Sequence, residues 1–301
     1  MEWSRATSGG SLKIRFKTVG ICTTVGGMIP LRDNIPSRTI PFVNYLLIAI
    51  SALVFFAQLT EAQGDASLIE QYGMIPARVM EPDRRIEVID EERVRTPVGV
   101  MARQVRRPAA GAAVPAIFTL LTCIFLHGGW MHFLGNMWFL FIFGDNVEDR
   151  FGHFGYLLFY LLCGVVASIA HLMSGPGSTV PTIGASGAIA AVMGAYFLLY
   201  PRAKVMTLIP IVFFFHVIVM PAPLFLGIWF LIQFFQGAFA LSGPQAAGVA
   251  WWAHIGGFVA GLAAAAWLLA RRKLRPRVET IRPGTERVQM YRLRRPGGPL
   301  Q

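Results

Sequence analysis

The sequence of 301 residues has little charge, because Asp, Glu, Lys and Arg together make up only 14% of it. Soluble domains carry about 25%. Charge is almost missing between Phe151 and Ala270, where only Arg202 and Lys204 carry any. An uncharged stretch of this length excludes a soluble domain and predicts several helices that cross a membrane.

Cysteine is also scarce: Cys22, Cys123 and Cys163 lie far apart, which excludes a disulfide framework and a zinc-binding spacing. The H-E-x-x-H pattern of zinc proteases is missing. We therefore expect neither a metal nor another cofactor. Residues 1–27 lack the apolar core of a signal peptide. They are either a flexible extension or the product of a misplaced start codon ahead of Met28.

The basic residues that are present give a net charge of +11. They gather near both ends of the chain and at Arg202 and Lys204, which is typical of the charge that sets membrane topology. We therefore expect no nucleic-acid partner. Residues 271–301 hold ten basic and two acidic residues. This tail either touches anionic lipid head groups or is simply solvated.

Apolar runs predict an all-α integral membrane protein with six transmembrane helices. Because the number of spans is even and both ends of the chain are basic, we expect both termini to lie in the cytoplasm. We expect the protein to be in the plasma membrane. Residues 1–42 are then a cytoplasmic extension, 43–270 the membrane domain and 271–301 a cytoplasmic tail. The second, fourth and sixth spans run inward from the outer face. The predicted spans are 43–60, 129–145, 154–173, 185–201, 222–240 and 249–270.

Three connecting segments are unusual. The first loop, 61–115, is polar and nearly neutral, and its charged part, 81–107, is expected to be a solvated surface or to bind a partner. The apolar segment 115–126 is too short for a span and predicts a re-entrant or interfacial element. The segment 205–221 predicts a membrane-embedded connector, because it is short and contains prolines, or else a seventh span.

Ser186 lies at the outer end of the fourth span, between Gly184 and Gly187. Small neighbours let another backbone approach, and the free N–H groups of a helix start attract negative charge. A serine in this position can attack a carbonyl while those groups hold the oxyanion. The alternative is a serine that serves helix packing alone.

His254 lies near the outer end of the sixth span, followed by Gly257 and Gly261 on the same helical face. This series of small residues predicts close packing against another helix. If that helix is the fourth span, His254 can accept the proton of Ser186. Otherwise His254 is a buried histidine that bonds a backbone carbonyl.

His132 and Asn136 are four residues apart at the outer end of the second span, with His127 just before it. Both side chains can donate hydrogen bonds to one point, as an oxyanion hole requires. Alternatively they join neighbouring helices, and His127 assists or holds its loop. The carboxylates nearest to this span lie at its inner end, so we predict a Ser186–His254 dyad without a third member.

The motifs HGGWMHFLGN (127–136), GASG (184–187) and AHIGG (253–257), in this order on these spans, resemble the rhomboid intramembrane serine proteases. The resemblance extends over 41–269. It implies a six-helix bundle with Ser186 as nucleophile, His254 as general base, and His132 and Asn136 in the oxyanion hole. It also implies that span five and the loop 241–248 act as a mobile gate and cap. The substrates it implies are single transmembrane helices of other proteins in the bilayer.

The sequence departs from the family pattern at two places. Phe118-Thr119 stands where some members have a Trp-Arg pair, and Ala190 where some have a tyrosine stacked on the histidine. Both leave open how His254 is held. Three other functions compete: a non-catalytic protein that binds membrane helices, a metal-dependent membrane protease, and a transporter. The presence of both Ser186 and His254 argues against the first.

Overall fold

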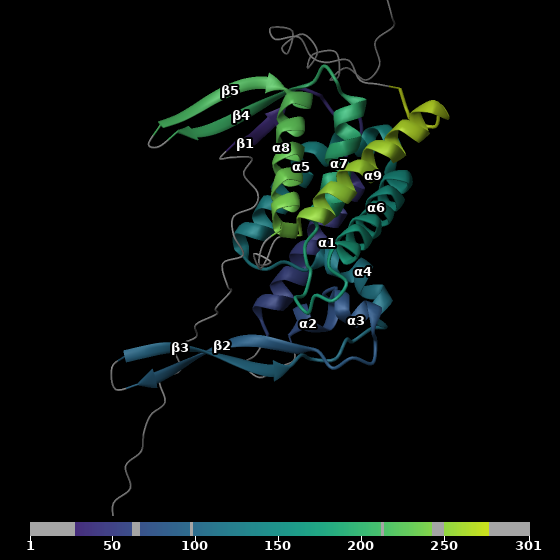
Figure 1. Ribbon diagram of the computed structural model, residues 1–301. Helices are drawn as coiled ribbons and strands as arrows, with labels where there is room; N and C mark the ends of the chain where they lie inside the picture. Colours follow the sequence, from purple (N-terminus) through teal and green to yellow (C-terminus); the bar gives the residue numbers. More distant parts are fainter. Residues whose placement is uncertain (1–27, 62–66, 97–98, 212–213, 243–249, 277–301) are drawn as a thin grey trace, which may run out of the picture.

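The computed structural model describes residues 28–61, 67–96, 99–211, 214–242 and 250–276. Long helices form a bundle, and strands lie at its two ends (Figure 1). The predicted spans appear as helices whose bounds differ from prediction by a few residues. They are α1 (Phe42–Leu59), α5 (Trp130–Phe151), α6 (His153–Ser174), α7 (Ser186–Leu199), α8 (Ala222–Ser242) and α9 (Trp251–Ala270).

Among the described residues, α1, α6, α8 and α9 are long and apolar enough to cross a membrane. Helix α5 becomes a fifth when it is counted with Ala116–Phe125, from which it is bent by 79°. Helix α7 has 14 residues, so it is about 21 Å long, against about 30 Å of hydrocarbon. The predicted helical membrane bundle is confirmed, whereas the number of six spans stays a prediction.

Helix α7 is the centre of the bundle. Every residue from Gly187 to Tyr196 is buried, and α5, α6, α8 and α9 all pack against it. The outer helices, by contrast, expose large apolar side chains such as Leu53, Leu162 and Phe239. These are the side chains that lipid would cover in a membrane.

The closest packing joins α7 to α9. A Cβ atom added at Gly257 would lie 2.0 Å from the carbonyl oxygen of Gly187, and one at Gly261 would lie 1.9 Å from that of Ala191. No side chain fits in such gaps. The predicted series of small residues therefore does bring the sixth span against the fourth. Residue numbers rise together along both helices, so α7 and α9 are parallel and begin at the same end.

Residues 204–211 and 214–221 do not form a seventh span, because both segments are strands and not a helix. They form β4 (Lys204–Ile211) and β5 (Phe214–Pro221), an antiparallel hairpin, and β4 also pairs with β1 (Ile29–Asp33). The run is rich in Val, Ile and Phe, which favour strands, and a residue next to a proline is disfavoured in a helix. This sheet follows the C-terminal end of α7 and lies at one end of the bundle (Figure 1). Ser186 is at the other end of the same helix.

Strand β1 is tied to the bundle by polar contacts. The Asp33 carboxylate accepts hydrogen bonds from the Asn146 amide (2.8 Å) and from the Tyr196 hydroxyl. The indole of Trp138 donates to the carbonyl of Pro30 at 2.6 Å. Burial raises the pKa of Asp33 to about 6. These bonds connect the sheet with both α5 and α7.

The first loop contains two short helices, α2 (Leu68–Tyr72) and α3 (Pro76–Met80), and a long hairpin, β2 (Glu87–Thr96) and β3 (Gly99–Pro108). The sequence analysis did not predict this hairpin, which projects beyond the helices (Figure 1). The turn after it, Ala116–Phe118, leads through α4 (Thr119–Thr122) and Cys123–Phe125 towards α5. These short turns agree with the expected re-entrant or interfacial element.

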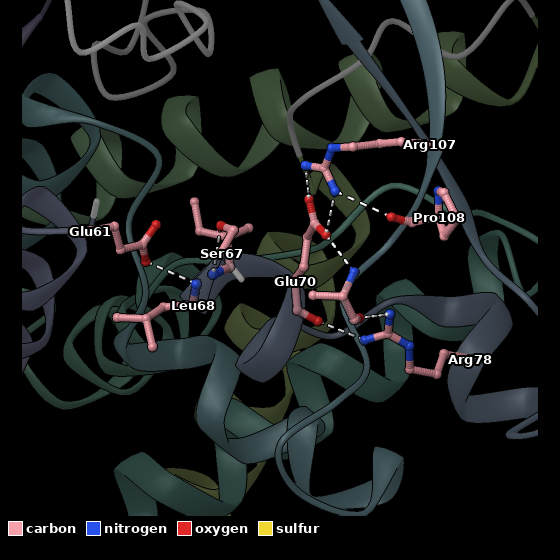
Figure 2. A network of polar contacts seen from close by, with 9 residues as sticks. Glu61, Ser67, Leu68, Glu70, Arg78, Arg107 and Pro108 are labelled. Atoms are coloured by element: carbon pink, nitrogen blue, oxygen red, sulfur yellow. Dashed lines mark hydrogen bonds and ion pairs between the residues drawn. The ribbon is translucent and has the colours of Figure 1, made fainter. Parts of the chain in front are cut away.

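A buried glutamate fastens the base of the hairpin. Glu70 receives two hydrogen bonds from the Arg107 guanidinium, of 2.7 and 3.1 Å, and one of 2.7 Å from the Ala110 N–H (Figure 2). Arg78 donates to the carbonyl oxygens of Glu70 and Ala110, at 2.6 and 2.7 Å. A paired, hydrogen-bonded carboxylate of this kind positions the hairpin relative to α2 and α3.

The contact between α7 and α9 predicts the effect of one methyl group. Gly261→Ala should lower the free energy of unfolding by about 1–3 kcal/mol, because the new Cβ atom displaces backbone. Gly155→Ala in α6 is the control, since the nearest atom to its Cβ would lie 3.8 Å away. Thermal unfolding in detergent measures both. Equal unfolding temperatures would contradict the proposed role of the contact.

Candidate active site

The structure brings Ser186 and His254 together. Ser186 is the first residue of α7, and His254 lies in the first turn of α9. The Oγ atom of Ser186 and the Nε2 atom of His254 are 2.7 Å apart, a hydrogen-bond distance. The parallel contact of α7 with α9 at Gly257 and Gly261 sets this distance. Two residues that are 68 positions apart in the chain are therefore hydrogen-bonded to each other.

The other ring nitrogen of His254 also has a partner, which the sequence analysis missed. Nδ1 lies 2.7 Å from Oε1 of Gln233, in α8. The Gln233 side chain is only 3% exposed, and His254 only 4%. The signal was present in the sequence, because Gln233 is a polar residue within the apolar run LGIWFLIQFF. A carboxylate is the usual third member beside a serine and a histidine. Here the residue in that position is an amide.

Two tryptophans enclose the imidazole of His254. The ring of Trp229 in α8 lies 5.7 Å from it, and that of Trp251 in α9 lies 6.2 Å away, nearly perpendicular. Ala190 is fully buried inside α7. Contacts from α8 and α9 therefore hold the ring where some family members have a stacked tyrosine.

His132 and Asn136 face the start of α7 from α5. A Cβ atom at Gly184 would lie 2.7 Å from Nε2 of His132 and 3.7 Å from Nδ2 of Asn136. Gly184 has a φ of +122°, which only glycine adopts readily. Because Gly184 has no side chain, it adopts this backbone conformation and also leaves room for the side chains of His132 and Asn136. It lies two residues before Ser186.

Both side chains offer donors to this space. The N–H of Gly128 lies 3.3 Å from Nδ1 of His132, which must accept this bond, so a neutral His132 carries its proton on Nε2. The Nδ2 atom of Asn136 is buried without a hydrogen-bond partner in the described part of the chain. An unpaired buried donor costs stability, so its presence calls for an explanation outside the fold.

His127 is fully buried before α5. Its backbone N–H and C=O both pair with the side-chain amide of Gln58 in α1, each at 3.0 Å. Its ring packs on that of His132, with 5.4 Å between the centroids. These contacts hold the loop that precedes His132.

The carboxylates of α5 serve the opposite end of the bundle. Glu148 accepts the N–H groups of Val43 and Asn44, at 3.0 and 2.7 Å, and Asp149 pairs with Arg38 at 3.0 Å. Among the described residues, no group of three or more His, Cys, Asp or Glu side chains could hold a metal ion.

Comparisons with known proteins identify the family of the chain. Residues 115–271 match the family model described as Rhomboid domain. This range includes Ser186, His254, Gln233, His127, His132 and Asn136. The chain is 41% identical over 75 residues to Rhomboid-like protein 11, chloroplastic, of Arabidopsis thaliana, which is 25% of this chain and 26% of that protein.

Two bacterial relatives come from Bacillus subtilis (strain 168). Rhomboid protease GluP is 42% identical over 76 residues, or 25% of this chain and 14% of that protein. Putative rhomboid protease YdcA is 35% identical over 86 residues, or 29% of this chain and 43% of that protein. The chain thus spans about a quarter of the length of the plant relative it matches and less than half of either bacterial protein.

Because the Nδ2 donor of Asn136 is unpaired in the described part of the chain, we expect removal of this side chain to cost little free energy of unfolding. Asn136→Ala should lower the free energy of unfolding less than Asn44→Ala does, and the difference between the two variants should be about 1–2 kcal/mol. The reason is that the Asn44 side chain bonds both the carbonyl of Leu140 and the Tyr156 hydroxyl, whereas Nδ2 of Asn136 has no partner among the described residues. Thermal unfolding of both variants in detergent tests this. A larger loss in Asn136→Ala would show that its amide is part of the fold's own bonding.

Proposed function

Because the chain belongs to the rhomboid family, whose domain covers residues 115–271, we propose that it is an intramembrane serine endopeptidase. Its substrates are transmembrane segments of other membrane proteins. The observation that carries the proposal is the distance of 2.7 Å between Ser186 Oγ and His254 Nε2 at the start of two parallel helices. No carboxylate or metal is needed for this chemistry.

Ser186 is the nucleophile and His254 the general base. The Ser186 hydroxyl attacks the carbonyl carbon of the scissile amide while Nε2 of His254 takes its proton. His254 then gives this proton to the leaving nitrogen, the C–N bond breaks, and the serine keeps the acyl group. A water molecule, deprotonated by His254, attacks the ester and releases the second product and the free serine.

The oxyanion of each tetrahedral intermediate lies beside Gly184. Nε2 of His132 and Nδ2 of Asn136 donate to it from α5, together with the backbone N–H of Ser186. The first N–H groups of a helix lack partners within that helix and form a natural site for negative charge. The buried, unpaired amide of Asn136 supports this role, because the oxyanion supplies the acceptor it lacks.

The substrate must be extended where it is cut. In a helix the carbonyl and N–H groups are bonded within the segment, so the scissile amide becomes accessible only after local unwinding. Gly184, Ala185 and Gly187 leave the backbone around the serine free of large side chains. Segments that contain glycine or helix-breaking residues near the end of their span are therefore favoured.

The site opens towards the outer face of the membrane, with both chain termini on the inner side. Arg202 follows α7 and Arg271 follows α9, so the basic residues lie at the bundle end opposite Ser186. The positive-inside rule places that end in the cytoplasm. We assign the protein to the plasma membrane.

A fluorescent fluorophosphonate, which traps activated serines, tests the dyad without a known substrate. We expect wild-type protein in detergent to be labelled, and Ser186→Ala and His254→Ala to remain unlabelled although folded. Labelling that persists in Ser186→Ala would contradict the nucleophile. Folded wild-type protein that stays unlabelled would instead favour a non-catalytic protein that binds membrane helices.

The oxyanion donors should affect rate rather than binding. Asn136→Ala and His132→Ala should each reduce the rate constant of inactivation by the fluorophosphonate at saturation, kinact, by roughly 10²–10³. The concentration for half-maximal rate, KI, should change little. Leu134→Ala, an exposed position on the same helix, is the control. A change confined to KI would assign the two side chains to binding instead.

A further inference from the structure

Gln233 bonds to the nitrogen of His254 that faces away from the serine. Resting on the proposed function, we infer that Gln233 is a positioning residue: from α8, it fixes the tautomer and the orientation of His254. The Gln233 Oε1 to His254 Nδ1 distance of 2.7 Å is as short as that between His254 and Ser186.

The chemistry of the amide determines the tautomer. An amide oxygen can only accept, so Nδ1 of His254 must carry a proton. A neutral imidazole carries one proton, which leaves the lone pair on Nε2, towards Ser186. In the other tautomer, Nε2 would donate to the serine and could not remove its proton. The single bond from Gln233 therefore selects the state in which His254 is a base.

The burial of Gln233 indicates that its bond to His254 does more than fill space between the helices. An amide in apolar surroundings costs free energy unless it is hydrogen-bonded. Gln233 lies on the stripe of α8 that faces the bundle, together with Leu226, Trp229 and Gly237. An apolar residue would fill this position at lower cost, as Leu226 does two turns earlier.

Helix α8 holds the imidazole with two groups from the same face. Trp229 covers its ring and Gln233 fixes Nδ1. Close by, a Cβ atom at Gly237 would lie 3.1 Å from Ile255 and 3.3 Å from Trp251, so α8 lies tightly on the first turns of α9. The opposite face of α8 exposes Leu231 and Phe235. The helix is thus attached along one face, and a shift of that face would release His254.

Three variants separate positioning from packing. Gln233→Leu removes the acceptor, and we expect kinact with the fluorophosphonate to fall about 10- to 100-fold with KI nearly unchanged. Gln233→Glu keeps an acceptor and should retain most of the activity. Its carboxylate also favours the protonated imidazole, so the acid limb of its pH–kinact profile should move to higher pH. Gln236→Leu, exposed on the same helix, should behave as wild type.

A second measurement reads the tautomer directly. Nitrogen-15 NMR of the histidine rings, with the His254 signal identified by its loss in His254→Ala, distinguishes a proton on Nδ1 from one on Nε2. We expect Nδ1–H in the wild type and in Gln236→Leu, and a mixture in Gln233→Leu. This measurement does not require activity, and on the wild type it requires only that His254→Ala folds, so that the signal of His254 can be assigned.

Two results would overturn the inference: wild-type kinact in folded Gln233→Leu, or a wild-type His254 with its proton on Nε2. Failure of the proposed function looks different, because the wild type itself would then not be labelled while the NMR signal of His254 still reports its tautomer.

Discussion

The contact between α7 and α9 is the constraint on which the site depends. At Gly257 and Gly261 the backbone of α9 lies against carbonyl oxygens of α7, with no room for a side chain. Backbone contact at this range fixes the relative height of the two helices, because a shift along the axis would drive side chains into those oxygens. Since the helices are parallel, fixed height sets Ser186 and His254 at one level. The distance between Ser186 and His254 is thus a consequence of packing along the helix pair.

Parallel packing also has an electrostatic consequence. Helices α5, α7 and α9 all begin at the end of the bundle where Ser186 lies. The N-terminus of a helix carries a partial positive charge. Three such ends favour the oxyanion of an acyl transfer and disfavour the imidazolium that forms at the same time. A partner that accepts from Nδ1 of His254 offsets this second effect, and α8 supplies it through Gln233.

The sequence allowed prediction of the elements whose signals are local. Apolar runs located the long helices, and the spacing of Gly257 and Gly261 predicted close packing of the sixth span against another helix, which the structure identifies as the fourth span. Gln233 was missed because its role depends on the angle at which α8 meets α9, which no spacing within one helix reveals. The strand pairing of 205–208 with 29–33 was missed for the same reason: it joins segments more than 170 positions apart. The hairpin of the first loop lies in a charged stretch whose composition suits a solvated surface as well as a strand.

The lack of charge that characterises residues 151–270 explains why the histidine has a neutral partner. A carboxylate beside Nδ1 would hold the imidazolium more strongly, as it does in soluble serine proteases. Inside an apolar bundle, however, an ionised carboxylate costs several kcal/mol more than an amide before any substrate arrives. An amide oxygen still accepts a directional hydrogen bond from Nδ1, and this bond selects the tautomer. Unlike a carboxylate, it carries no full charge. The imidazolium is then stabilised mainly by the oxyanion formed beside it in the same step, so the two charges appear and disappear together. Such a site remains nearly uncharged at rest, as the bilayer requires, and becomes polar only during the reaction.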